Sequence, residues 1–255
     1  MPHVLLYAVV TLVASCLTGR LVPPGLASFI LSMWMPAIVA VVLVLVERRT
    51  FREALGLRFG RLPDHLIAVA IPTLVAAGTA AIGVATGHLT RDPSFSLSAG
   101  RAIPSLIFWI IAALGEEVGW RGYMHHGLRG RKHAPLLIGI VWATWHLPSL
   151  LQDPKCSAVG LAIFFVAVLQ ISYVFSWLAD RSGSVLVCAT MHGSWDFMRM
   201  QVLFGSATGK PGVFKTNAPL LTEMEGVFGT IVVLLVVLVV VKPWRGRAAP
   251  DAPTA

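Results

Sequence analysis

The amino-acid sequence predicts an all-α, polytopic membrane protein: a bundle of about eight transmembrane helices with a polar site inside the membrane, forming a single transmembrane domain over residues 1–255. Three observations indicate this fold class. Only 13% of the 255 residues are charged, about half of the roughly 25% found in soluble domains. The mean hydropathy is +0.77. Apolar runs of about 20 residues, the length that crosses a bilayer, recur along the chain.

The expected spans follow one another with short connections. They cover approximately residues 4–19, 26–46, 66–88, 104–128, 134–152, 158–179, 184–205 and 224–241. Within the last span, the stretch 227–241 has Thr230 as its one polar side chain. The fourth, fifth and seventh spans carry charged or histidine side chains, and residues 104–200 therefore form the core in which we expect the function to reside.

Basic residues are distributed unevenly between the expected loops. They concentrate in segments 47–65 and 129–132 and in the tail from Lys242 onwards. Because basic loops stay on the cytoplasmic side, we expect an integral, multi-pass protein of a bacterial plasma membrane with both termini cytoplasmic. The segment 47–65 either lies along the inner membrane surface, with its arginines on lipid phosphates, or is a solvated loop.

The net charge of +8 would favour nucleic-acid binding in a soluble protein. Here the basic residues lie between apolar runs, so we expect membrane lipids as partners and no nucleic acid. The three cysteines (Cys16, Cys156 and Cys188) are widely spaced and form no CxxC motif. The sequence therefore predicts neither a disulfide framework nor a zinc ribbon, and it gives no indication of the oligomeric state.

Several ionisable side chains fall within the expected spans, where a charge costs a few kcal/mol. Glu117 and Arg121 lie four residues apart on one helix face and are expected to pair. Glu116 points about 100° away from Glu117, and we expect no partner for it in its own helix. Asp196 has Arg199 three residues further on, so these two could form an ion pair and nothing more.

Depth in the membrane brings three side chains from different spans together. Glu116, His146 and His192 each lie about 12 to 18 Å from the inner end of their span, at roughly 1.5 Å per residue. A layer with one carboxylate and two imidazoles can hold a base, hydrogen-bonding groups or a metal ion. Taken singly, each histidine is more often a packing residue, and the pair of Glu117 and Arg121 is more often a structural clamp. Their shared depth favours a site.

These side chains lie in three motifs. EEVGWRG (116–122) has the form EExxxR, WATWH (142–146) resembles FxxxH, and HGSWD (192–196) resembles Hxxx(N/D). In this order on successive membrane helices, the chain resembles the CPBP family of intramembrane proteases, also called the Abi family, which includes type II CAAX prenyl proteases and bacteriocin-processing enzymes. Trp142 stands where Phe is usual, which we expect to change packing only, and Asp196 stands where Asn is common.

The resemblance implies hydrolysis of a peptide bond in a membrane-tethered substrate, either a prenylated CAAX-type protein or a leader peptide. The catalytic residues that it implies are Glu116, Glu117, Arg121, His146, His192 and Asp196. In one mechanism, Glu116 is the general base, His146 orients the water, and His192 and Asp196 stabilise the oxyanion. In the other, Glu116, His146 and His192 bind zinc and Glu117 is the base. We favour the first, which requires no cofactor.

Two other functions could use the same polar residues. An ion-coupled transporter also places carboxylates and histidines within the membrane, but we see no matching pair of interrupted helices of the kind that inverted-repeat transporters have. A non-catalytic scaffold or immunity protein could retain the polar site for binding a partner. Both stay as alternatives to the protease.

Overall fold

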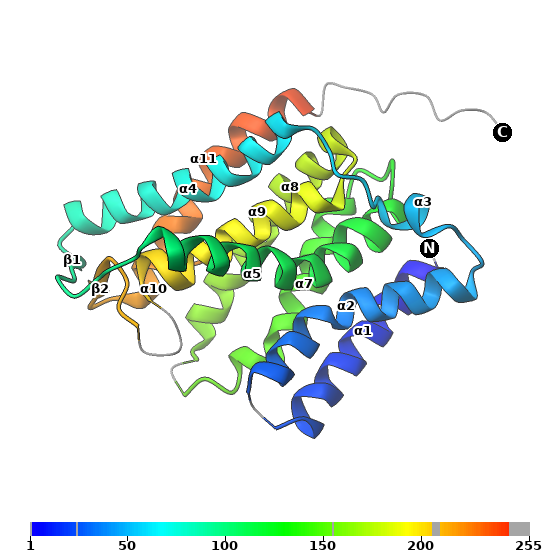
Figure 1. Ribbon diagram of the computed structural model, residues 1–255, viewed down its shortest axis with the longest axis horizontal. Coiled ribbons are helices and arrows are strands. Elements are labelled where there is room, and N and C mark those ends of the chain that lie inside the picture. The colour runs from blue at the N-terminus through cyan, green and yellow to red at the C-terminus, as the bar shows by residue number, and fades with distance from the viewer. Residues whose placement is uncertain (1, 24, 155, 206–209, 245–255) are drawn as a thin grey trace.

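Long helices dominate the computed structural model, which describes residues 2–23, 25–154, 156–205 and 210–244 (Figure 1). The long helices are α1 (Pro2–Leu21), α2 (Leu26–Val46), α4 (Leu62–Ala85), α5 (Ala99–Glu117), α7 (Ala134–Leu150), α8 (Ala158–Ser182), α9 (Val185–Phe197) and α11 (Val227–Trp244). Shorter elements are α3 (Phe51–Leu55), α6 (His125–Gly127), α10 (Pro219–Thr222), the π-helical segments η1 (Val118–Met124) and η2 (Met198–Leu203), and the antiparallel strands β1 (Leu89–Arg91) and β2 (Phe214–Thr216).

The helices have the length and composition of membrane spans, which confirms the predicted fold class. Within the described residues, six helices are long and apolar enough to cross a bilayer, and the protein is an integral, multi-pass membrane protein. They match all the predicted spans except the fifth and the seventh. These two correspond to α7, which has 17 residues, and to α9 continued by η2. These two helices carry His146 and His192. The helices that are too short to count as membrane spans are therefore the ones that hold the site histidines.

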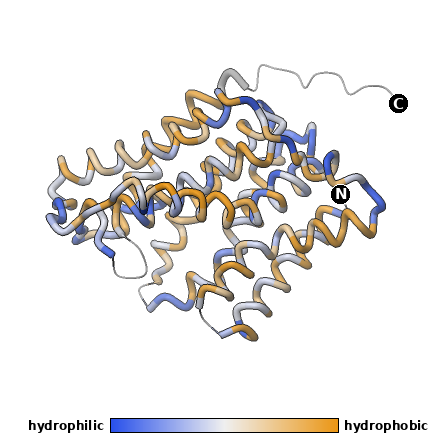
Figure 2. The backbone as a smooth tube through the Cα atoms, viewed as in Figure 1, coloured by the Kyte–Doolittle hydropathy of each residue, from blue (hydrophilic) through white to orange (hydrophobic). Residues whose placement is uncertain are grey.

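Apolar side chains cover the outside of the bundle as well as its core. Leu5 is 68% exposed on α1 and Val239 is 72% exposed on α11. Figure 2 shows the hydrophobic colour running along the outer helices, whereas hydrophilic residues gather at the helix ends. Contiguous apolar surface of this kind is not found on water-soluble monomers, and it is the surface that lipid would cover.

The loops that hold most of the arginines meet at one end of the bundle, called here the basic face. The Val185 amide donates to the Gly56 carbonyl at 3.1 Å, and Arg181 Nε donates to Asp64 Oδ1 at 2.8 Å. Strands β1 and β2 lie at the opposite end of the bundle (Figure 1). Of the predicted basic tail, the part beyond Trp244 lies outside the described residues.

The segment 47–65 makes contacts that neither of its two predicted forms includes. Within it, α3 buries Ala54 and Leu55 against the bundle. Gly56 adopts a left-handed conformation with φ 61, and a Cβ there would lie 3.0 Å from the His126 ring. Further along, the Ser184 hydroxyl donates to the Arg58 carbonyl. The segment is therefore packed onto the start of α9, while arginines within it, such as Arg52 and Arg58, stay exposed.

Glycine residues let three of the helices approach closely. A Cβ at Gly193 in α9 would lie 2.4 Å from backbone atoms of Ile110 in α5. On another face of α5, a Cβ at Gly115 would lie 2.6 Å from the Met33 carbonyl oxygen of α2. Since real Cβ atoms do not come so near to backbone, only glycine allows these contacts. They place α5, which carries the paired glutamates, directly between α2 and α9.

Candidate active site

Two π-helical segments begin immediately after the polar residues of α5 and α9. The α-helical part of α5 ends at Glu117, and η1 starts at Val118. On the other helix, η2 starts at Met198, two residues after Asp196. Short π-helical segments are rare and occur frequently at functional sites. The sequence predicted continuous regular helices over 104–128 and 184–205 and did not predict either segment.

Glu117 is the centre of a buried ionic cluster. Its Oε1 accepts hydrogen bonds from Arg121 Nη1 at 2.8 Å and from His192 Nδ1 at 2.8 Å. The side chains of Glu117 and Arg121 are fully buried, at 0% exposure each. The expected pair of Glu117 and Arg121 is therefore present. It also includes His192 of α9, a contact that the spacing of the motif residues did not predict.

The Arg121 guanidinium contacts two aromatic rings that lie side by side. Its Cζ is 4.4 Å from the centre of the Trp142 ring and 4.3 Å from that of Phe175. Its Nε and Nη2 have no hydrogen-bond partner in the part of the chain that the structure describes. Contact between a desolvated cation and an aromatic face contributes about 2 kcal/mol of stabilisation. The two rings therefore add to the stabilisation of the Arg121 charge that Glu117 provides at Nη1.

Glu116 is held by two indoles. Its Oε2 accepts from Trp120 Nε1 at 3.1 Å and from Trp142 Nε1 at 2.7 Å. The expectation that Glu116 has no partner in its own helix is wrong, because Trp120 is four residues further on. The expectation that Trp142 changes packing only is also wrong, because Phe could not donate this bond. Glu116 Oε1 makes no hydrogen bond to any described residue.

His146 reaches the cluster through Trp142. Its Nδ1 is 2.9 Å from the Trp142 carbonyl oxygen, which can only accept, so Nδ1 carries the proton and Nε2 has a free lone pair. The Trp142 ring centre lies 6.0 Å from that of His146 and 5.4 Å from that of His192. Among the described residues no hydrogen bond joins His146 directly to either glutamate. The three helices are thus brought together around one indole.

Asp196 faces His192 and not Arg199. The Oδ2 of Asp196 is 3.8 Å from His192 Nε2, which is longer than a hydrogen bond. Arg199 pairs instead with Glu225, at 2.9 Å from Nε to Oε2, and with Glu223, at 3.4 Å from Nη2 to Oε2. The structure therefore differs from the alternative in which Asp196 only forms an ion pair with Arg199.

The donor arrangement does not fit the zinc alternative. No three His, Cys, Asp or Glu side chains within the described ranges lie close enough to bind one metal ion. Glu116 Oε2 already accepts two indole hydrogens, and Glu117 Oε1 accepts from both Arg121 and His192. Glu116, His146 and His192 therefore do not form the open set of ligands that a catalytic zinc ion requires.

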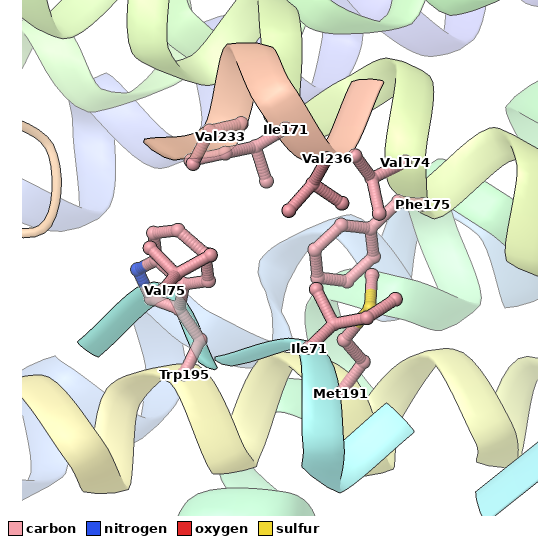
Figure 3. Close-up of a pocket in the computed structure, with 9 residues that line it drawn as sticks. All are labelled: Ile71, Val75, Ile171, Val174, Phe175, Met191, Trp195, Val233 and Val236. Atoms are coloured by element: carbon pink, nitrogen blue, oxygen red, sulfur yellow. The ribbon is translucent and has the colours of Figure 1, made fainter. Parts of the chain in front are cut away.

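An apolar cavity between α4, α8, α9 and α11 lies beside the polar cluster. Figure 3 shows Phe175 and Trp195 on opposite sides of it. Phe175 also faces Arg121, and Met191 precedes His192, so the cavity and the polar cluster share walls. The sequence analysis did not predict this cavity, because its lining lacks charged residues: Ile71, Val75, Ile171, Val174, Phe175, Met191, Trp195, Val233 and Val236.

Comparison with known proteins identifies the segment that carries the site. A family model described as type II CAAX prenyl endopeptidase Rce1-like matches residues 98–198. A protein of Methanococcus maripaludis named CAAX prenyl protease 2 is 29% identical over 98 residues, which are 34% of this chain and 36% of that protein. The match thus spans little more than a third of the relative. Over residues 98–198, which include every site side chain named in the three motifs, the chain is similar to type II CAAX prenyl endopeptidases.

Proposed function

We propose that the chain is an intramembrane endopeptidase that hydrolyses a peptide bond in a membrane-tethered peptide or protein. The observation that supports this most strongly is the geometry of Glu116. One carboxylate oxygen is fixed by two indole donors, while the other makes no hydrogen bond to the described residues and can bind a water molecule. The name of the matched relative, a prenyl protease, supports the same reaction.

In the proposed reaction, Glu116 acts as the general base. A water molecule gives a proton to Glu116 Oε1 as its oxygen forms a bond to the scissile carbonyl carbon. His146 Nε2, whose lone pair is left free because Nδ1 is bound to the Trp142 carbonyl, accepts the second hydrogen of this water and orients it. The proton on Glu116 then moves to the amide nitrogen as the carbon–nitrogen bond breaks, which leaves a carboxylic acid and an amine.

His192 is the proposed donor to the oxyanion. Its Nδ1–H is held by Glu117, which is held in turn by Arg121, so the ring orientation is fixed before the substrate binds. Its Nε2 lies on the side of Asp196. Two carboxylates flanking the ring stabilise an imidazolium, which can donate through Nε2 to the developing negative charge. In this arrangement Asp196 stabilises the charged form of His192. Asp196 does not need to donate a hydrogen bond to the oxyanion, which is what an Asn at this position would do.

Two substrate classes stay open for this site. One is a protein with a prenylated cysteine near its C-terminus, and the other is the leader of a membrane-bound precursor peptide. Both bring an apolar anchor into the bilayer next to the scissile bond.

The test is cleavage of prenylated CAAX peptides and leader peptides in vesicles by the purified chain. Glu116→Gln, His146→Ala and His192→Ala should each lower kcat by about 10²- to 10⁴-fold, the usual contribution of acid–base groups, while the proteins stay folded. His88→Ala is the matched control, because the His88 side chain bonds Asn217 near the β-strands, away from the site, and it should cleave like the wild type.

Treatment with a chelator separates the two mechanisms. Activity should persist in chelated protein if Glu116 activates the water directly. Near-normal cleavage by folded Glu116→Gln would contradict the proposed function. A loss of activity on chelation that zinc alone restores would replace the glutamate mechanism with the metal one.

A further inference from the structure

A short turn beyond the family match contacts the site helix α9. Glu223 and Glu225 lie between α10 and α11. Glu225 accepts a hydrogen bond from Trp195 Nε1 at 2.7 Å through one oxygen and pairs with Arg199 at 2.9 Å through the other. One carboxylate thus bridges two residues a helical turn apart, and Asp196 lies between them in the chain.

The turn is held firmly in place. Met224, between the two glutamates, is fully buried. The Gly226 amide donates to the Glu223 carbonyl at 2.9 Å, and a Cβ at Gly229 would lie 2.0 Å from the Met224 carbonyl oxygen. Since backbone and core both fix the turn, the Glu225 carboxylate, whose side chain is 14% exposed, is presented to Arg199 at a defined position.

Arg199 has a competing partner close by in sequence. It lies three residues after Asp196, a spacing at which opposite charges on an α-helix can pair. In the described residues no ion pair joins these two, and the one recorded for Asp196 is that with His192. Arg199 therefore forms ion pairs with the two glutamates of the turn. Without them, Arg199 could pair with Asp196 and move it away from His192.

We propose that Glu225 is a positioning residue that sequesters Arg199 and thereby keeps Asp196 beside His192. This inference rests on the proposed function, because Asp196 matters there as the group that supports His192. Trp195 contributes to the same arrangement. Its indole donates to Glu225, and its ring lines the apolar cavity (Figure 3), so the turn before α11 and the site helix are joined on both sides of Asp196.

The test uses a charge change with little change in shape. Glu225→Gln keeps an oxygen that can accept from Trp195 but loses the charge that pairs with Arg199. We expect kcat to fall at least tenfold with KM changed less than threefold. In the double variant Glu225→Gln/Arg199→Gln the released cation is absent, so kcat should return to within threefold of the wild type. Glu223→Gln is the matched control, because Glu223 is 41% exposed and more distant, and it should lose less than twofold.

A merely structural role for Glu225 gives a different pattern. The double variant would then be at least as impaired as Glu225→Gln, and this result, or wild-type kcat in Glu225→Gln, would overturn the proposal. The ring nitrogen resonances of His192, measured by NMR on histidine-labelled protein in micelles, give a readout that does not require cleavage. They should shift in Glu225→Gln and return in the double variant. If the wild-type chain cleaves no peptide, the proposed function fails, while these resonances still decide whether Arg199 is sequestered.

Discussion

At the scale of single residues, Arg121 combines an ion pair with two aromatic faces. Glu117 bonds one of its nitrogens, and the rings of Trp142 and Phe175 lie 4.4 and 4.3 Å from its Cζ. A charge buried in this way is expensive to leave alone, because water cannot replace the missing partner. Loss of either charge alone is therefore expected to destabilise the bundle.

Arg121→Met should lower the free energy of unfolding by about 3 kcal/mol, since the buried Glu117 carboxylate loses its permanently charged partner and keeps the bond from His192. Glu117→Gln/Arg121→Met removes both charges and should recover most of that stability. Thermal unfolding in detergent micelles measures the difference. A double variant that is less stable than Arg121→Met would show that the lost ring packing, and not the unpaired charge, is what matters at this position.

Trp142 shows why residue roles are only partly readable from the chain. The aromatic position of the motif indicates packing, and the ring does pack on Arg121. The bond from its Nε1 to Glu116 depends on the distance between α5 and α7, which periodicity does not determine. In contrast, the pair of Glu117 and Arg121 was predictable, because both partners lie on one helix and their spacing fixes the geometry.

At the scale of helices, the distance between α5 and α9 sets the site. Gly193 follows His192 directly, and its missing side chain lets α9 approach Ile110 of α5. His192 can then reach Glu117 on the same helix pair, at 2.8 Å. That the three motif helices meet was predictable from the placement of their polar residues, whereas the π-helical turns η1 and η2 were not, because no residue type encodes them uniquely.

Gly193→Ala should push α9 away from α5 and lower both thermal stability and cleavage, the latter at least tenfold. The reason is that the new Cβ would lie 2.4 Å from Ile110 backbone atoms, which cannot move aside as a side chain can. Gly100→Ala, near the start of α5, meets no atom within 4 Å and is the control. It should be as stable as the wild type or slightly more so, since alanine favours helix. Equal behaviour of the two variants would contradict this account of the contact.

At the scale of the whole molecule, hydropathy predicted most of the architecture because a span must satisfy its backbone internally and cover itself with apolar side chains. The helices α1, α2, α4, α8 and α11 follow this rule, and their predicted positions agree with the structure. The helices α7 and α9 are shorter or more polar, and they carry the site histidines. The strands β1 and β2, three residues each, carry no periodic signal long enough to predict.

The distribution of basic loops also predicts how the molecule lies in the membrane. The basic face includes Leu57, which is 40% exposed, and Thr90 is exposed on β1 at the opposite end. We expect the basic face in the cytoplasm, because arginine-rich loops are retained there. With Cys16 and Cys156 replaced by Ser and the buried Cys188 kept, a membrane-impermeant maleimide should label Thr90→Cys on intact cells. Leu57→Cys should be labelled only after the cells are permeabilised. The reverse labelling pattern would contradict this orientation and place the basic face on the outer side of the membrane.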